Sequence, residues 1–236
     1  MKKALSITVM LFIAFNSIAQ IESKGKVEIY PLNLASADSL GGFQIEHLVL
    51  SEILGLNDEE LEKLENPVLR EGISLFGRAF VYDDTLYPEV IKNFTELINN
   101  KELSQNKLAL RVGYILRGLS KNQLKDYRGA ILDFNKVISL TNEKEVGANL
   151  IGGLKMLAAT YSYRGQSKRN LNHSFQEVML DHNKSIRLNP NDGLNYFRSA
   201  ISRQKFNQIE EACLDFSIAG ELGVIEAYEV IKFYCD

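Results

Sequence analysis

The stretch DYRGAILDFNKVISL, residues 126–140, decides the fold class of this chain. Its apolar side chains recur at helical intervals and form one continuous face, which predicts an amphipathic α-helix, at Tyr127, Ala130, Ile131, Phe134, Val137 and Ile138. The segment before it, residues 108–122, is apolar over much of its surface, so we expect a helix with neighbours on two sides. Gly118 lies inside that segment. Because glycine costs about 1 kcal/mol in a helix interior, it predicts a close backbone approach by a partner helix.

The same spacing returns along the chain. Residues 209–223 repeat it at Ala212, Phe216 and Ala219, and residues 87–99 hold a weaker copy at Val90, Phe94 and Leu97. When Ala130, Val178 and Ala212 are aligned, the second interval is 34 residues and the first is 48. Self-similarity near 34 residues with two helices per unit predicts a stacked helical array.

These positions resemble the tetratricopeptide repeat family over roughly residues 66–236. The matching residues are Tyr114, Gly118, Tyr127, Ala130, Phe134 and Val137, then Leu154, Leu157, Ala158, Tyr161, Ser185 and Pro190, then Tyr196, Ala200, Ala212, Phe216 and Ala219. The resemblance implies an all-α, right-handed superhelical array of antiparallel helix pairs. We expect an N-terminal cap at 20–65, a degenerate repeat at 66–100, repeats at about 108–142, 151–191 and 192–223, and a capping helix at 224–235.

The middle repeat departs from the pattern of the family. It carries about eight extra residues, which we place within residues 164–174, and the link before it is also long. A basic cluster of Arg164, Lys168 and Arg169 falls in this proposed insertion. We interpret it as three cations of an exposed loop, with a site for an acidic partner as the alternative.

In the tetratricopeptide family, the first helices of successive repeats line a concave face that holds extended peptides or partner helices. Carried over by motif position, the lining here is Val112, Ile115, Leu119, Asn122, Lys155, Tyr163, Leu194, Phe197 and Ile201. Ile115 and Leu119 stand where a carboxylate clamp would need polar residues, so the groove is expected to bury apolar anchors of a partner. The alternative is that these residues face the N-terminal segment of the protein itself.

Composition and motifs favour a non-catalytic protein-binding scaffold. The chain has 236 residues, is 45% hydrophobic and carries a formal charge of −3, so no basic excess indicates nucleic acid as a partner. The sequence contains no HExxH, GxSxG or P-loop motif, and we expect neither catalytic residues nor a cofactor. The alternative is a metal-dependent accessory factor or enzyme using His173, Glu177 and Asp181, which share one side of a helix. A solvated helix face explains that trio equally well.

The first 19 residues predict export. Lys2 and Lys3 precede an apolar run over residues 4–15, and small residues follow at Ser17 and Ala19, which is the layout of a secretory signal peptide. The run is shorter than a membrane span, although a short retained anchor is the alternative, and no later stretch is apolar enough to cross a bilayer. We therefore expect a periplasmic or extracellular protein without a transmembrane segment in its mature form.

Export also changes how the two cysteines are interpreted. An oxidising compartment permits a disulfide between Cys213 and Cys235, and two helices folded as an antiparallel hairpin would bring them together. The alternative is a pair of buried free thiols.

Overall fold

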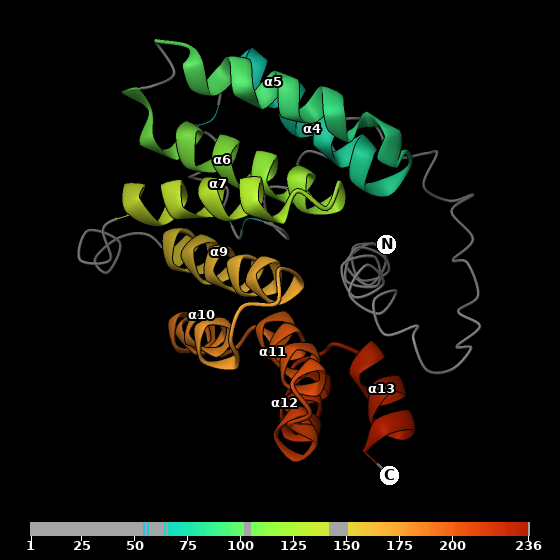
Figure 1. Ribbon diagram of the computed structural model, residues 1–236. Coiled ribbons are helices and arrows are strands. Elements are labelled where there is room, and N and C mark those ends of the chain that lie inside the picture. Colours follow the sequence, from blue (N-terminus) through green and yellow to red (C-terminus); the bar gives the residue numbers. More distant parts are fainter. Residues whose placement is uncertain are drawn as a thin grey trace.

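The computed structural model describes residues 66–101, 105–141 and 151–235, together with Leu54, Leu56 and Leu64. Within these residues all regular structure is helical (Figure 1). The predicted signal peptide and most of the predicted N-terminal cap lie outside the described residues.

Nine α-helices follow one another in the described part of the chain. Their bounds are α4 (Pro67–Val81), α5 (Tyr87–Asn99), α6 (Lys107–Gln123), α7 (Tyr127–Leu140), α9 (Ile151–Asn170), α10 (Phe175–Leu188), α11 (Gly193–Lys205), α12 (Ile209–Glu221) and α13 (Glu226–Tyr234), with a short 3-10 helix, η3 (Asp84–Leu86), between α4 and α5. Side chains of the preceding residues accept hydrogen bonds from the first turn of five of these helices, at Asn66, Asn106, Asp126, Ser174 and Asp192. Such caps accept hydrogen bonds from backbone N–H groups that have no partner inside the helix. The identity of the capping residue therefore helps to determine where each of these helices begins.

The helices pack in chain order. Each helix contacts the next one, and α4, α6, α9 and α11 also contact one another in sequence, so they form one row (Figure 1). This confirms the all-helical fold with adjacent helices packed in pairs. The superhelical path and the capping role of the two ends stay predictions.

The turns inside the three C-terminal pairs repeat the same backbone geometry. Lys125, Asn172 and Asn207 adopt left-handed conformations with φ of 62°, 58° and 60°. In each turn the N–H of the following residue (Asp126, His173 or Gln208) donates to a carbonyl five residues earlier. The turn after α9 therefore has the same construction as the other two.

This geometry corrects the predicted insertion within residues 164–174. Helix α9 is continuous from Ile151 to Asn170, so Arg164, Lys168 and Arg169 lie in a helix and not in an exposed loop. The extra length comes earlier, in the longer separation between α7 and α9 and in the greater length of α9 itself. The predicted long link before the middle repeat falls on residues 142–150, which lie outside the described residues.

The apolar core is divided into two clusters. One combines residues of α4–α9 with Leu54, Leu56 and Leu64, and the other combines residues of α11, α12 and α13. Leu194 at the start of α11 packs against both clusters. Between them, α9, α10 and α11 bury polar side chains, including His182, Arg198 and Ser202. The two apolar clusters are therefore joined by a region in which buried polar side chains lie between α9, α10 and α11.

The disulfide between Cys213 and Cys235 is present and ties α13 to α12. Cys213 lies in the second turn of α12 and Cys235 follows the last residue of α13, and their Cα atoms are 5.7 Å apart. Ala227 and Val230 of α13 are buried against the C-terminal cluster. The bond holds this short helix on the end of the array.

Replacing Cys235 with serine should lower the free energy of unfolding. The bond closes a sequence separation of 22 residues, and a cross-link over a loop of this size stabilises by about 3 kcal/mol in the chain-entropy model. Chemical denaturation with and without a reductant measures the effect. Reduction should shift the unfolding midpoint of the wild-type chain and leave that of Cys235→Ser unchanged, and an unshifted wild-type midpoint would contradict the assignment.

Candidate functional site

A buried aspartate joins the two helices of each C-terminal pair. Asp133 of α7 accepts hydrogen bonds from Arg117 of α6 at Nε (3.0 Å) and Nη2 (2.6 Å), and from Lys121 Nζ at 2.8 Å. Arg117 Nη1 also donates to Thr95 Oγ1 of α5 at 3.0 Å. The ion pair therefore links three consecutive helices.

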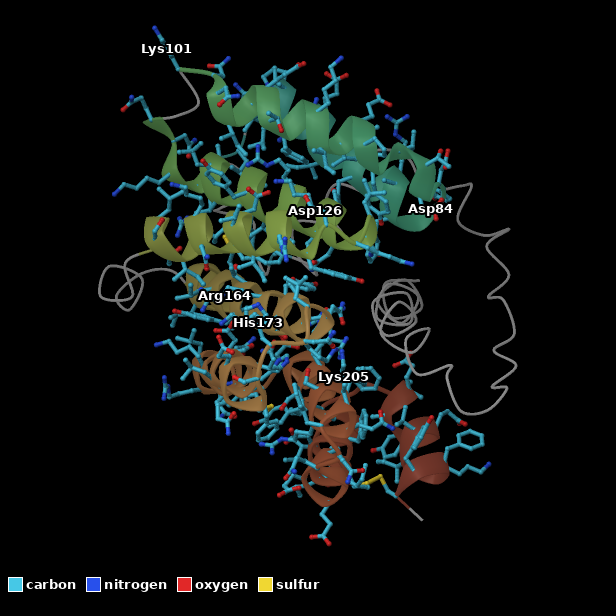
Figure 2. All side chains as sticks on the ribbon, in the orientation of Figure 1. Asp84, Lys101, Asp126, Arg164, His173 and Lys205 are labelled. Carbon is cyan, nitrogen blue, oxygen red and sulfur yellow. A yellow bond between two sulfur atoms is a disulfide. The ribbon has the colours of Figure 1, made fainter. Side chains whose placement is uncertain are left out.

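Asp181 of α10 repeats this arrangement against α9. It accepts from Arg164 Nε (2.9 Å) and Nη2 (2.6 Å) and pairs with Lys168 Nζ at 2.8 Å. Arg164 Nη1 reaches back to Asn135 Oδ1 of α7 at 2.6 Å, and Figure 2 shows Arg164 on α9, between α7 and α10. Two of the three residues predicted as loop cations are thus the partners of a buried carboxylate.

The third aspartate, Asp215 of α12, accepts from Ser199 Oγ (2.7 Å) and Arg203 Nε (2.9 Å) of α11. Burial raises the pKa of Asp215, and the hydrogen bond from Ser199 and the positive charge of Arg203 oppose that rise. We call Asp133, Asp181 and Asp215 the repeat aspartates, since each directly precedes the ring at Phe134, His182 or Phe216. The sequence prediction did not single out Asp133 and Asp215, and it considered Asp181 only as a metal ligand, because the repeats were aligned without these acidic positions.

A small residue faces each ring in the first two of these pairs. A Cβ atom on Gly118 would lie 2.8 Å from the ring of Phe134, and one on Gly165 would lie 3.0 Å from Nε2 of His182. The backbone approach predicted at Gly118 is corrected: the atoms that come close to this glycine belong to the side chain of Phe134 and not to the backbone of the partner helix. The equivalence of Gly118 and Gly165 also fixes the register of α9.

His182 is a neutral, buried packing residue. Its Nε2 lies 2.8 Å from Ser202 Oγ, and Ser202 donates its single hydroxyl proton to the Arg198 carbonyl at 3.0 Å. The hydrogen-bond pattern therefore assigns the imidazole proton to Nε2. Burial, together with the charges of Arg169, Arg198, Arg203 and Lys168, lowers the pKa of His182 to about 3. The ring is therefore uncharged near neutral pH.

The structure does not bring His173, Glu177 and Asp181 together as metal ligands. His173 Nδ1 and Glu177 Oε1 lie 3.4 Å apart on the surface near the start of α10 (Figure 2), where Glu177 also forms a capping box with Ser174. Asp181 is buried, and both of its oxygens face α9. Among the described residues there is no group of three or more His, Cys, Asp or Glu side chains that could hold a metal ion.

Most of the predicted groove residues are buried in the structure. Val112, Ile115 and Leu119 belong to the N-terminal cluster, which also holds Leu54, Leu56 and Leu64, and Phe197 and Ile201 belong to the C-terminal cluster. Tyr163 is 7% exposed and packs between the ring of Phe134 and the guanidinium of Arg198. These six side chains form core and do not offer an open apolar surface. Lys155 is exposed, and Asn122 and Leu194 are half-buried.

The register of α9 also corrects two of the groove assignments. Ile115 and Leu119 stand three residues before and one after Gly118, so their counterparts around Gly165 are Ser162 and Gln166. The prediction had used Lys155 and Tyr163. That prediction aligns Ala158 with Gly118, because it places the extra residues of the middle repeat within residues 164–174. The middle of the row is therefore polar.

Hydrogen bonds between alternate helices tie this row together. Ser167 Oγ of α9 lies 2.8 Å from Asn122 Oδ1 of α6 and 2.9 Å from the Tyr163 carbonyl, and its single hydroxyl proton is shared between these two acceptors. Lys205 Nζ of α11 donates to the Arg169 carbonyl at 2.8 Å and to Asn172 Oδ1 at 2.9 Å (Figure 2). A lysine at the last carbonyls of a helix also interacts favourably with the helix dipole. The C-terminal ends of α6, α9 and α11 are thus held side by side.

Comparisons with known proteins give no relative: no family model, no curated protein and no solved structure matches the chain. None of the described helices combines the length and the apolar character that a membrane span requires.

Proposed function

We propose that this chain is an exported, non-catalytic interaction scaffold that binds another protein. The observation that supports the proposal is that the acidic and histidine side chains considered for catalysis or metal binding stabilise the fold instead. Asp181 is occupied by two cations, Glu177 closes a capping box, and His182 is buried as a neutral ring. In this stack of helix pairs, the buried polar groups hold neighbouring helices together. The stack also presents an extended outer surface, and proteins built from stacked repeats use such surfaces to bind partners.

The binding surface that we propose is the accessible part of the row α6, α9 and α11. Lys155 is exposed, and Asn122 and Gln166 are half-buried. Amide and ammonium groups of this kind hydrogen-bond the backbone carbonyls and acidic side chains of an extended peptide. Since the apolar residues of the row are buried, we propose polar recognition of a peptide or helix in place of burial of apolar anchors.

Export to the periplasm or the exterior is part of the proposal. The disulfide between Cys213 and Cys235 is compatible with an oxidising compartment, because such bonds persist where thiols are not kept reduced. The predicted signal peptide at residues 1–19 supplies the route.

A photo-crosslinking residue at position 155 tests the binding surface. The matched control is position 136, where an exposed lysine of α7 lies outside the row. We expect position 155, and not position 136, to capture a defined protein from the native envelope. Once that protein is purified, Lys155→Glu should weaken its binding about tenfold or more, which corresponds to about 1.4 kcal/mol, and Lys136→Glu should leave binding unchanged. Equal capture at both positions, or unchanged affinity of Lys155→Glu, would reject the proposal.

A further inference from the structure

The last helix of the array presents an apolar strip to solvent. Ile225, just before α13, is 57% exposed, and Tyr228 and Phe233 are 51% and 62% exposed. Helix α13 packs on α12 through Ala227 and Val230, and one part of the half-exposed Tyr228 ring also lies against Gly220 of α12. Within the described chain, α13 is the final element and has a neighbouring helix on one side, α12 (Figure 1). Each earlier helix from α5 to α12 has a helix before it and a helix after it.

Two opposite charges lie on the same strip as these apolar residues. Glu229 and Lys232 are exposed and three residues apart, so they project from one side of the helix. In an antiparallel pair of two α13 helices related by a twofold axis, Glu229 of one copy comes opposite Lys232 of the other. The same register places Tyr228 of one copy opposite Phe233 of the other. This follows because residues 229 and 232, like residues 228 and 233, are centred between residues 230 and 231. The strip is therefore complementary to itself.

We propose that two copies of the chain associate through α13, packed as an antiparallel helix pair about a twofold axis. Such an interface is isologous, so each residue pair occurs twice and the assembly closes at two copies. The disulfide between Cys213 and Cys235 keeps α13 fixed on α12. The helix is thus ordered before association, and this lowers the entropy cost of forming the dimer. This inference uses the end of the array and does not depend on the proposed binding surface around Lys155.

The size of the strip sets the strength of this association. A large apolar side chain that is half exposed contributes about 100 Å² to an interface. Ile225, Tyr228 and Phe233, with their charged neighbours, then bury about 800 Å² in total over the two copies, which is below the range of stable interfaces. The dimer should accordingly be reversible and dependent on concentration.

Sedimentation equilibrium of the purified, oxidised chain tests the proposal by charge exchange. We expect the wild-type chain to dimerise reversibly, and Glu229→Lys and Lys232→Glu each to weaken association about tenfold or more. An equimolar mixture of these two variants should recover dimers, because the variant strips carry opposite charges. Phe233→Gln should also weaken association. The control Leu132→Gln removes a leucine of α7 that is 66% exposed, and it should leave association unchanged.

Three outcomes would overturn the proposal. The first is a wild-type chain that stays monomeric up to millimolar concentration, as it would if another segment of the same chain covered the strip. The second is a mixture of Glu229→Lys and Lys232→Glu that dimerises no better than either variant alone. The third is a loss of dimers in Leu132→Gln equal to that in Phe233→Gln. Circular dichroism of each variant shows whether it has kept its helices, and all of these positions are exposed, so we expect unchanged spectra.

Discussion

Asp181→Ala should lower the free energy of unfolding by about 3 kcal/mol or more, because removing one partner of a buried ion pair leaves uncompensated charge. The carboxylate is 1% exposed and holds Arg164 and Lys168 within 2.8 Å. Both cations are largely buried, so water replaces the lost carboxylate poorly. Reversible urea unfolding at neutral pH measures the change.

Two controls separate the ion pair from the loss of a side chain. Glu96→Ala removes an exposed carboxylate on α5 and should change stability by less than about 0.5 kcal/mol. The triple variant Arg164→Met, Lys168→Met and Asp181→Leu replaces all three charges by apolar groups and should be more stable than Asp181→Ala. If Asp181→Ala unfolded at the same urea concentration as Glu96→Ala, the ion pair of Asp181 would not stabilise the packing of α9 on α10.

Acidification should destabilise the chain through His182. The pKa of this ring is about 3 in the folded chain and about 6.5 in an unfolded one. The unfolded state therefore binds the proton more readily between these values. The contribution of the neutral ring is present above pH 6.5 and is lost as the pH falls through 3, up to a total of about 5 kcal/mol. Urea unfolding at pH 7 and at pH 4.5 measures the part lost in that interval.

His182→Phe should remove most of this acid sensitivity. Phenylalanine already occupies the equivalent positions Phe134 and Phe216, so the packing site accepts an aromatic ring. The matched control is His173→Gln, which removes a half-buried histidine at the surface and should keep the wild-type difference between the two pH values. Equal acid sensitivity in His182→Phe and the wild-type chain would show that other groups cause it.

The helices could be predicted where one apolar face runs through a short segment. The stretch 126–140 predicts a helix that the structure places at Tyr127–Leu140, and the copy at 209–223 corresponds to Ile209–Glu221. The full extent of helix α9 was harder to predict from the sequence, because its apolar and polar residues are spread around the whole helix and form no single apolar face. Arg164 and Lys168 resemble loop cations in the sequence, and only the structure shows that Asp181, on the next helix, supplies their opposite charge.

The candidate groove could not be derived from the sequence for a related reason. Motif position predicts which side of a helix faces a neighbour, but not which other segment covers that side. Leu54, Leu56 and Leu64 come from the segment before α4 and share a cluster with Val112 and Ile115. Burial of these side chains is thus a property of the tertiary fold. The cysteine pairing was predictable because only one pair exists and consecutive antiparallel helices bring its members together.

The central claim is that successive helix pairs stack so that α6, α9 and α11 lie side by side. Asn122 and Ser167 are 45 residues apart in sequence and hydrogen-bonded across α6 and α9. A chain carrying Asn122→Cys and Ser167→Cys should therefore be cross-linked within one molecule by a short bifunctional thiol reagent. A chain carrying Lys136→Cys and Ser167→Cys should not react in this way. Absence of the first cross-link in folded protein, or equal yields for the two pairs, would contradict the stacked arrangement.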